Sequence, residues 1–178
     1  MLDSFENLLE TLKTEDEIGK VIRTHIHFEN AINHFLFIAL EKPQNLKNVK
    51  LDYYGKINLA ACLGLPEDII KPLISIGKIR NSFAHNLDNK IDTDKINNFF
   101  NSFSNKSKEE MIQNCINKNP PWFPEAKSWK DIAMAERFFV MCFSLFSEIR
   151  SAITVLEFNK KELQLKIEHT DLKAKFNQ

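Results

Sequence analysis

The sequence predicts an all-α protein, built as an up-and-down helical bundle with a long C-terminal helix. The 178 residues include only 4 Gly and 6 Pro, too few for a sheet-rich chain that turns about every ten residues. Apolar residues recur at three- and four-residue spacing along most of the chain, which is typical of amphipathic helices. Short turns separate these segments, and short turns favour antiparallel neighbours in a bundle.

The first two helices are predicted over residues 4–13 and from about Asp16 to Leu40. The first carries an apolar face of Phe5, Leu8, Leu9 and Leu12. The second ends before Pro43, and its expected core-facing stripe is Ile18, Ile22, Ile26, Glu29, Ile32, Leu36 and Ala39. Because an unpaired buried carboxylate is costly, Glu29 in this stripe needs a partner.

The third helix is predicted from Asp52 to Leu63 and is stopped by Gly64 in the manner of a C-cap. Pro66 opens the fourth, with acidic residues in its first turn where the helix dipole favours them. The core-facing stripe of this fourth helix is Ile69, Leu73, Ile76, Arg80, Phe83 and Leu87. Arg80 is therefore a charged residue at a helix position that is expected to face the core.

The second half of the chain predicts one or two weaker helices over residues 92–118, broken near Asn105. Residues 119–124, Asn-Pro-Pro-Trp-Phe-Pro, predict an extended loop. Ser128 and Asp131 form a capping pair expected to start the last long helix, which would end at about Phe158.

The tail beyond this helix alternates Leu163, Leu165 and Ile167, which is strand spacing without an obvious partner strand. We therefore interpret it as an arm or a helix extension. The sequence indicates one helical domain over residues 1–158 and a C-terminal tail or arm over 159–178.

Charge and cysteine content narrow the class of protein. Lys+Arg and Asp+Glu both number 24, so a broad nucleic-acid surface is not expected, although one small basic site is compatible with this balance. Cys62, Cys115 and Cys142 form no C-x-x-C pair, as in a reduced cytosolic protein. The acidic N-terminal segment does not resemble a secretion signal, and the apolar stretch 138–146 is short for a membrane span. We expect a soluble cytoplasmic protein without membrane contact.

The most informative segment is Ile79-Arg80-Asn81-Ser82-Phe83-Ala84-His85. An Arg followed after four residues by a His, near the end of a bundle helix, resembles the R-x4-H motif of HEPN domains. A wider resemblance, over about residues 18–157, is to the mannitol-operon repressor (MltR) family. The segments that carry it are Tyr54 to Ala60, Leu63-Gly64-Leu65, Glu29-Asn30 and the Pro-rich loop.

The HEPN resemblance implies a metal-independent endoribonuclease of a toxin–antitoxin or phage-defence kind, active as a homodimer with its sites at the interface. Arg80, His85 and Asn81 are then the expected catalytic residues, RNA the expected substrate and an antitoxin a possible partner. A His suits either proton role, an Arg grips a phosphate with two N–H groups, and Asn81 could orient the imidazole. No metal or other cofactor is expected.

Helical geometry places Arg80 and His85 about 140° apart around their helix, and a dimer would reconcile this angle with a shared substrate. A structural interpretation stays open, in which Arg80 pairs with Glu29 as a buried ion pair and His85 interacts with the helix dipole. The third interpretation is a non-catalytic regulator or helical interaction module that acts through a protein partner, since no basic helix-turn-helix is evident.

His25, His27 and His34 share the second helix, but no metal-ligand spacing completes them, so we expect ordinary surface or core histidines.

Overall fold

The computed structural model describes residues 4–85, 90–117 and 126–176, apart from the side chains of His85, Asn117 and residues 171–176. All regular elements in these ranges are helices, which confirms the all-α fold class. The α-helices are α1 (Phe5–Thr14), α2 (Glu17–Ala39), α3 (Tyr53–Cys62), α4 (Glu67–His85), α5 (Thr93–Ser102), α6 (Asn105–Ile112) and α7 (Met134–Phe176). The short elements are the 3-10 helices η1 (Pro43–Asn48) and η3 (Trp129–Asp131) and the π-helical turn η2 (Gln113–Asn117).

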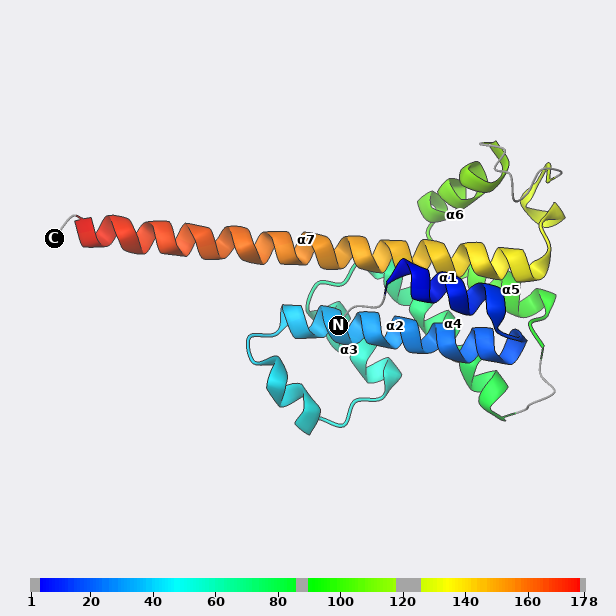
Figure 1. The fold of residues 1–178 in the computed structure, drawn as a ribbon, viewed down its shortest axis with the longest axis horizontal. Helices are drawn as coiled ribbons and strands as arrows, with labels where there is room; N and C mark the ends of the chain where they lie inside the picture. Colours follow the sequence, from blue (N-terminus) through cyan, green and yellow to red (C-terminus); the bar gives the residue numbers. More distant parts are fainter. Residues whose placement is uncertain (1–3, 86–89, 118–125, 177–178) are drawn as a thin grey trace.

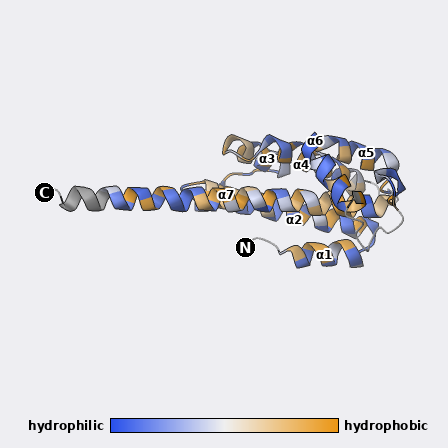
Figure 2. Cartoon of the chain, turned by 90° about the horizontal axis from the view of Figure 1, so that it is seen from above, coloured by the Kyte–Doolittle hydropathy of each residue, from blue (hydrophilic) through white to orange (hydrophobic). Residues whose placement is uncertain are grey.

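Helices α2 and α7 lie side by side along the molecule and form the middle layer of the bundle (Figure 1). Helix α1 covers one side of this pair, while α3, α4 and α5 lie on the other (Figure 2). Because α2 contacts α1, α3, α4 and α7, it touches every layer of the bundle. The middle layer therefore organises the fold.

Polar caps define where the helices begin. Side-chain oxygens of Ser4, Asp16, Asp52, Asp92 and Ser104 accept hydrogen bonds from the backbone N–H groups of the first turns of α1, α2, α3, α5 and α6. Helix α3 ends as predicted, because Gly64 adopts a left-handed φ of 96° and the Leu65 N–H returns to the Ala60 carbonyl at 2.9 Å. Local capping chemistry thus sets the helix boundaries.

The apolar core is centred on α7. Its buried residues in the bundle are Phe138, Met141, Cys142, Leu145, Phe146, Ile149 and Ile153. The ring centroid of Phe28 of α2 lies 6.4 Å from that of Phe146, and the centroid of Phe99 of α5 lies 6.1 Å from that of Phe138. The stripe expected on the fourth helix is largely confirmed, since Ile69, Leu73, Ile76 and Phe83 are buried.

The stripe expected on the second helix is confirmed at Ile32 and Leu36 and is wrong at Ile26. Ile26 is 48% exposed, and the buried face is rotated around α2. The residues on the buried face are Val21, Thr24, His25, Phe28, Ala31, Ile32, Phe35 and Leu36. This face also repeats at three- and four-residue spacing, and it carries two Phe rings that remove more apolar surface from water than the Ile row would.

The start and the end of the last helix also differ from expectation. The Ser128 N–H donates to the Asp131 carboxylate at 2.8 Å, but this pair caps η3, and α7 begins only at Met134. The helix does not end at Phe158. It continues to Phe176, so the tail is a helix extension rather than a strand. At 43 residues α7 is about 65 Å long and projects well beyond the bundle (Figure 1).

One helix in the described part of the chain, α7 from Met134 to Thr170, is long and apolar enough to cross a membrane by length and composition. The central helix of a soluble bundle meets the same test. In this structure 33% of the apolar window is buried inside the protein, and Phe143 is 39% exposed.

Helices α3 and α4 approach closely at Gly77, and this contact generates a first prediction. A Cβ at position 77 would lie 2.8 Å from Cε1 of Tyr53, which is sterically forbidden without movement of a buried ring. We expect Gly77→Ala to lower the free energy of unfolding by about 1–3 kcal/mol, as overpacking does, although alanine favours helix. Urea denaturation measures the change.

Gly19→Ala is the matched control, because the closest atom to a Cβ there is the flexible end of the Glu15 side chain. This variant is expected to be neutral or slightly stabilising. Equal stability of the two alanine variants would contradict the close α3–α4 contact.

Candidate functional site

Arg80 and Asn81 lie in the last turns of α4, and both are half-buried. Ile79, directly before them, and Phe83, two residues after Asn81, are buried in the core. The apolar stripe of α4 therefore fixes the rotation of the helix, and Arg80 and Asn81 emerge at the edge of the packed region.

A short polar network links these two residues to the neighbouring helix. Arg80 Nη1 donates to Asn81 Oδ1 at 3.2 Å, and Asn81 Nδ2 donates to the Tyr54 hydroxyl of α3 at 3.5 Å. Burial, and next the charge of Asp52, raises the pKa of Tyr54, so its hydroxyl stays protonated near neutral pH. Asn81 thus holds the Arg80 guanidinium with its oxygen and Tyr54 with its nitrogen.

A buried aromatic pair lies beneath this network. The Tyr53 ring packs against the His25 imidazole with centroids 4.1 Å apart, and the Tyr53 hydroxyl donates to the Leu73 carbonyl at 3.0 Å. Burial lowers the pKa of His25 to about 4; Glu29 opposes this shift, and Arg80 adds to it. His25 is therefore neutral at physiological pH and lies within electrostatic reach of Arg80.

Glu29 has a different partner from the one expected. Its Oε1 accepts a hydrogen bond from Lys56 Nζ of α3 at 2.7 Å, with both side chains partly buried. The expected Glu29–Arg80 ion pair is not formed. The reason is that α3 packs beside α2 and places Lys56 directly at the carboxylate.

The two cations of this region, Lys56 and Arg80, therefore differ in whether a carboxylate of the protein neutralises their charge. The charge of Lys56 is compensated by Glu29. Among the described residues, Arg80 has no carboxylate within ion-pair distance, and its guanidinium donates a hydrogen bond to the amide oxygen of Asn81. A guanidinium oriented by a neutral amide is suited to an anionic ligand, because no carboxylate of the protein neutralises its charge.

The backbone of α4 extends to His85, but the His85 side chain lies outside the described residues, as do Leu87 and the 119–124 loop. The structure thus brings together Arg80, Asn81 and Tyr54. The spatial relation of the His85 imidazole to Arg80 stays a prediction.

Sequence reasoning did not single out Tyr53, and it gave His25 no role. Tyr54 and Lys56 belong to the segment that carried the family resemblance, which was the one available signal for them. Arg137 on α7 was also missed: it is 9% exposed, and its buried Nε has no hydrogen-bond partner among the described residues.

The other histidines of α2 have structural contacts. His27 Nε2 and the Thr11 hydroxyl of α1 lie 3.0 Å apart, and His34 lies 3.7 Å from the Glu157 carboxylate of α7. No group of three or more potential metal ligands occurs in the part of the chain that the structure describes.

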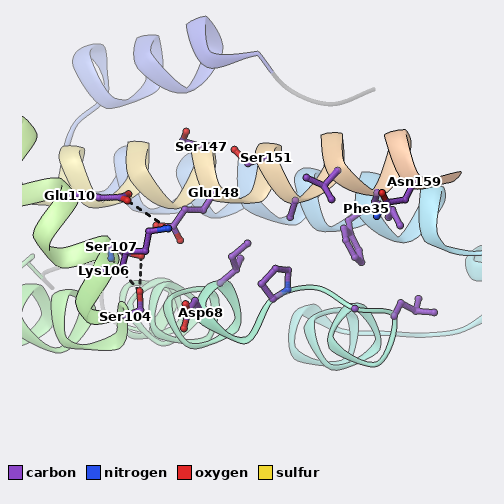
Figure 3. A pocket seen from close by; sticks show the side chains of 17 residues that line it. Phe35, Asp68, Ser104, Lys106, Ser107, Glu110, Ser147, Glu148, Ser151 and Asn159 are labelled. Atoms are coloured by element: carbon purple, nitrogen blue, oxygen red, sulfur yellow. Dashed lines mark hydrogen bonds and ion pairs between the residues drawn. The ribbon is translucent and has the colours of Figure 1, made fainter. Parts of the chain in front are cut away.

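A separate cavity of about 540 Å³ lies between the start of α4, α6 and α7 (Figure 3). Its lining includes Asp68, Glu110 and Glu148 and a single cation, Lys106, which lies 4.0 Å from Glu110. Burial raises the pKa of Glu148; the Ser107 hydroxyl opposes this shift, and Glu110 and Asp68 reinforce it. An acidic lining repels phosphate, so this cavity does not suit a nucleic acid.

Comparisons of the chain with protein-family models, with curated proteins and with solved structures return no match. A functional assignment therefore depends on the motif residues and on the geometry around Arg80.

The neutral state of buried His25 generates a second prediction. Because its pKa is about 4 in the folded protein and about 6.5 when unfolded, the unfolded chain takes up this proton first on acidification. The contribution of His25 to stability is present above pH 6.5 and is lost as the pH falls towards 4. We expect His25→Phe to flatten the loss of unfolding free energy between pH 7 and pH 5, measured by urea denaturation at each pH.

His34→Phe serves as the control, since His34 lies at the surface of the α2–α7 contact rather than beneath Arg80. It should leave the pH dependence close to that of the parent chain. A His25→Phe variant with an unchanged pH slope would show that His25 is not held neutral.

Proposed function

We propose that this protein is a metal-independent endoribonuclease of the HEPN kind that acts as a homodimer, with Arg80, Asn81 and His85 in each site. The observation that carries the proposal is the environment of the Arg80 side chain. Its guanidinium is half-buried, oriented by Asn81, and without a carboxylate partner among the described residues. Such a group binds a phosphodiester through two N–H donors and keeps its charge at all relevant pH values.

The proposed reaction needs only acid–base chemistry. The 2′-hydroxyl of RNA loses its proton and attacks the adjacent phosphorus, the bond to the 5′-oxygen breaks, and that oxygen takes up a proton. The products are a 2′,3′-cyclic phosphate and a 5′-hydroxyl. His85 would move the protons, the Arg80 guanidinium would stabilise the charge that builds on the phosphate, and Asn81 would hold Arg80 in place.

The dimer is part of the proposal because Arg80 and His85 are separated around α4. A two-fold axis beside the end of α4 would let Arg80 and His85 residues from both protomers act on one phosphodiester. The resemblance to HEPN domains and to the mannitol-operon repressor family supports this arrangement. It also favours a cytoplasmic setting in toxin–antitoxin or phage defence, with an antitoxin that restrains the activity.

A non-catalytic regulator that acts through a protein partner is the alternative. It is favoured by an apolar groove of about 860 Å³ between α1, α6 and α7, of a size that would accept an amphipathic helix. Leu9, Leu12, Met111, Phe139, Val140 and Phe143 supply most of its apolar lining. Absence of RNA cleavage by the dimer would favour this alternative.

The ribonuclease proposal is tested by cleavage of a labelled RNA in the presence of EDTA. We expect the parent chain to produce 2′,3′-cyclic phosphate ends. Arg80→Ala and His85→Ala should each lower the rate by on the order of 10²- to 10⁴-fold, the usual contribution of a positioned acid–base group. Their melting temperatures should stay close to that of the parent, because Glu29 keeps its partner Lys56 in both variants.

Lys78→Ala and His34→Ala are the matched controls. Lys78 is an exposed cation on the same helix, two residues before Arg80, and His34 is a histidine of α2. Both should retain cleavage. RNA left intact by the parent dimer, or equal activity in all four variants, would rule out the proposal.

A further inference from the structure

The C-terminal part of α7, residues 157–176, is here called the arm. It projects from the bundle at the end opposite α5 (Figures 1 and 2). Every residue from 157 to 170 is exposed, and His34 of α2 approaches only Glu157, at the very start of the arm. Most of the stability of a protein helix comes from the packing of its apolar face, and the arm has no such packing within one chain.

The arm nevertheless carries large apolar side chains. Phe158 is 66% exposed, and Leu163, Leu165 and Ile167 are each more than half exposed. Soluble proteins scatter single apolar residues on their surfaces, but here four lie within ten residues of one unsupported helix. The arm is therefore an unpartnered surface.

These side chains form rows that are continuous with the core. Cys142, Ile149, Leu156 and Leu163 recur every seven residues on one face of α7, and the first two are fully buried in the bundle. Ile167 lies one turn beyond Leu163 on the same face. Phe158 and Leu165 begin a second row with the same spacing. Seven-residue spacing of apolar residues is the pattern by which helices pair in coiled coils.

The charges of the arm discriminate between possible partners. The arm contains five lysines and four acidic residues. The lysines are Lys160, Lys161, Lys166, Lys173 and Lys175, and the acidic residues are Glu157, Glu162, Glu168 and Asp171. The formal net charge of the arm is only +1, five lysines less four acidic residues. This gives little attraction for nucleic acid or for an anionic membrane surface, both of which need a clear basic excess. Interspersed charges of both signs, as in the Glu162–Lys166 pair at 2.6 Å, are compatible with a second arm of the same sequence.

We propose that a second copy of this chain covers the arm, the two arms packing side by side as a short two-stranded coiled coil. The arms continue the face that each α7 already buries in its own bundle, so the pairing extends the two cores along one line of contact. This interface uses α7 and is separate from the Arg80 region. The proposal therefore does not depend on the proposed ribonuclease activity.

The test is the molar mass of the full chain by light scattering after size exclusion, over a range of concentrations. The arm contact joins chains in pairs, in addition to any contact at the end of α4. Leu163→Glu places a charge in the shared row and should halve the molar mass of the parent assembly, with an at least tenfold weaker dissociation constant for the arm contact. Circular dichroism should show a loss of helix in this variant, because an uncovered arm frays.

Gln164→Glu is the matched control, since it adds the same charge one residue further along, on the polar face with Glu157, Lys161 and Glu168. It should keep the molar mass of the parent chain. A parent chain that is monomeric at all concentrations would overturn the proposal. Dimers of equal strength in Leu163→Glu and Gln164→Glu would overturn it as well, and would place the dimer contact elsewhere while leaving the ribonuclease proposal intact.

Discussion

The arrangement of three helices around the candidate site depends on the Tyr53 side chain. Its ring lies against His25 of α2 on one side and against Gly77 of α4 on the other, and its hydroxyl donates to the Leu73 carbonyl. Leu73 and Gly77 are one turn apart, so the missing side chain at position 77 opens a path for the phenol to reach that carbonyl. Asn81 is one further turn along the same face of α4, which is why it meets Tyr54, the neighbour of Tyr53. One packed phenol thereby sets the spacing of α2, α3 and α4 and the position of Asn81.

Features that depend on neighbouring residues were predictable from the sequence. The end of α3 at Gly64 and the buried stripe of α4 follow from local capping chemistry and helical spacing. The buried face of α2 was not predictable in the same way, because two overlapping faces of this helix have apolar spacing. The face that is buried is the one that carries Phe28 and Phe35, which pack into the core with residues of other helices.

In the candidate site too, features set by neighbouring residues were predictable, and features set by contacts between distant residues were not. The motif identified Arg80 and Asn81, but the partner of Glu29 is set by the packing of α3 on α2, a contact between residues 27 positions apart. The end of α7 was missed for another reason. An alternation of apolar residues resembles a strand when the chain is examined alone, whereas in a continuous helix it produces two separate apolar rows.

The overall charge of zero conceals a separation of charge within the molecule. Arg80 lies beside a neutral His25, so no second positive charge forms next to it at physiological pH. The cavity between α4, α6 and α7 has the opposite character, with three carboxylates and one lysine in its lining. A balanced composition therefore permits one small cationic region suited to phosphate and an acidic region that repels it.

The unbroken course of α7 has a consequence for the evolution of its length. Ile149, which is packed in the bundle, and Leu163, near the far end, belong to one continuous helix. The packing of Ile149 therefore fixes the direction in which Leu163 faces. Insertion of a single residue between them would turn the distal apolar row by about 100°, whereas insertion of seven residues would nearly restore it. Homologous chains with such a helix should therefore differ in length here by about 7, 11 or 18 residues, which keep the direction of the distal row within about 20°.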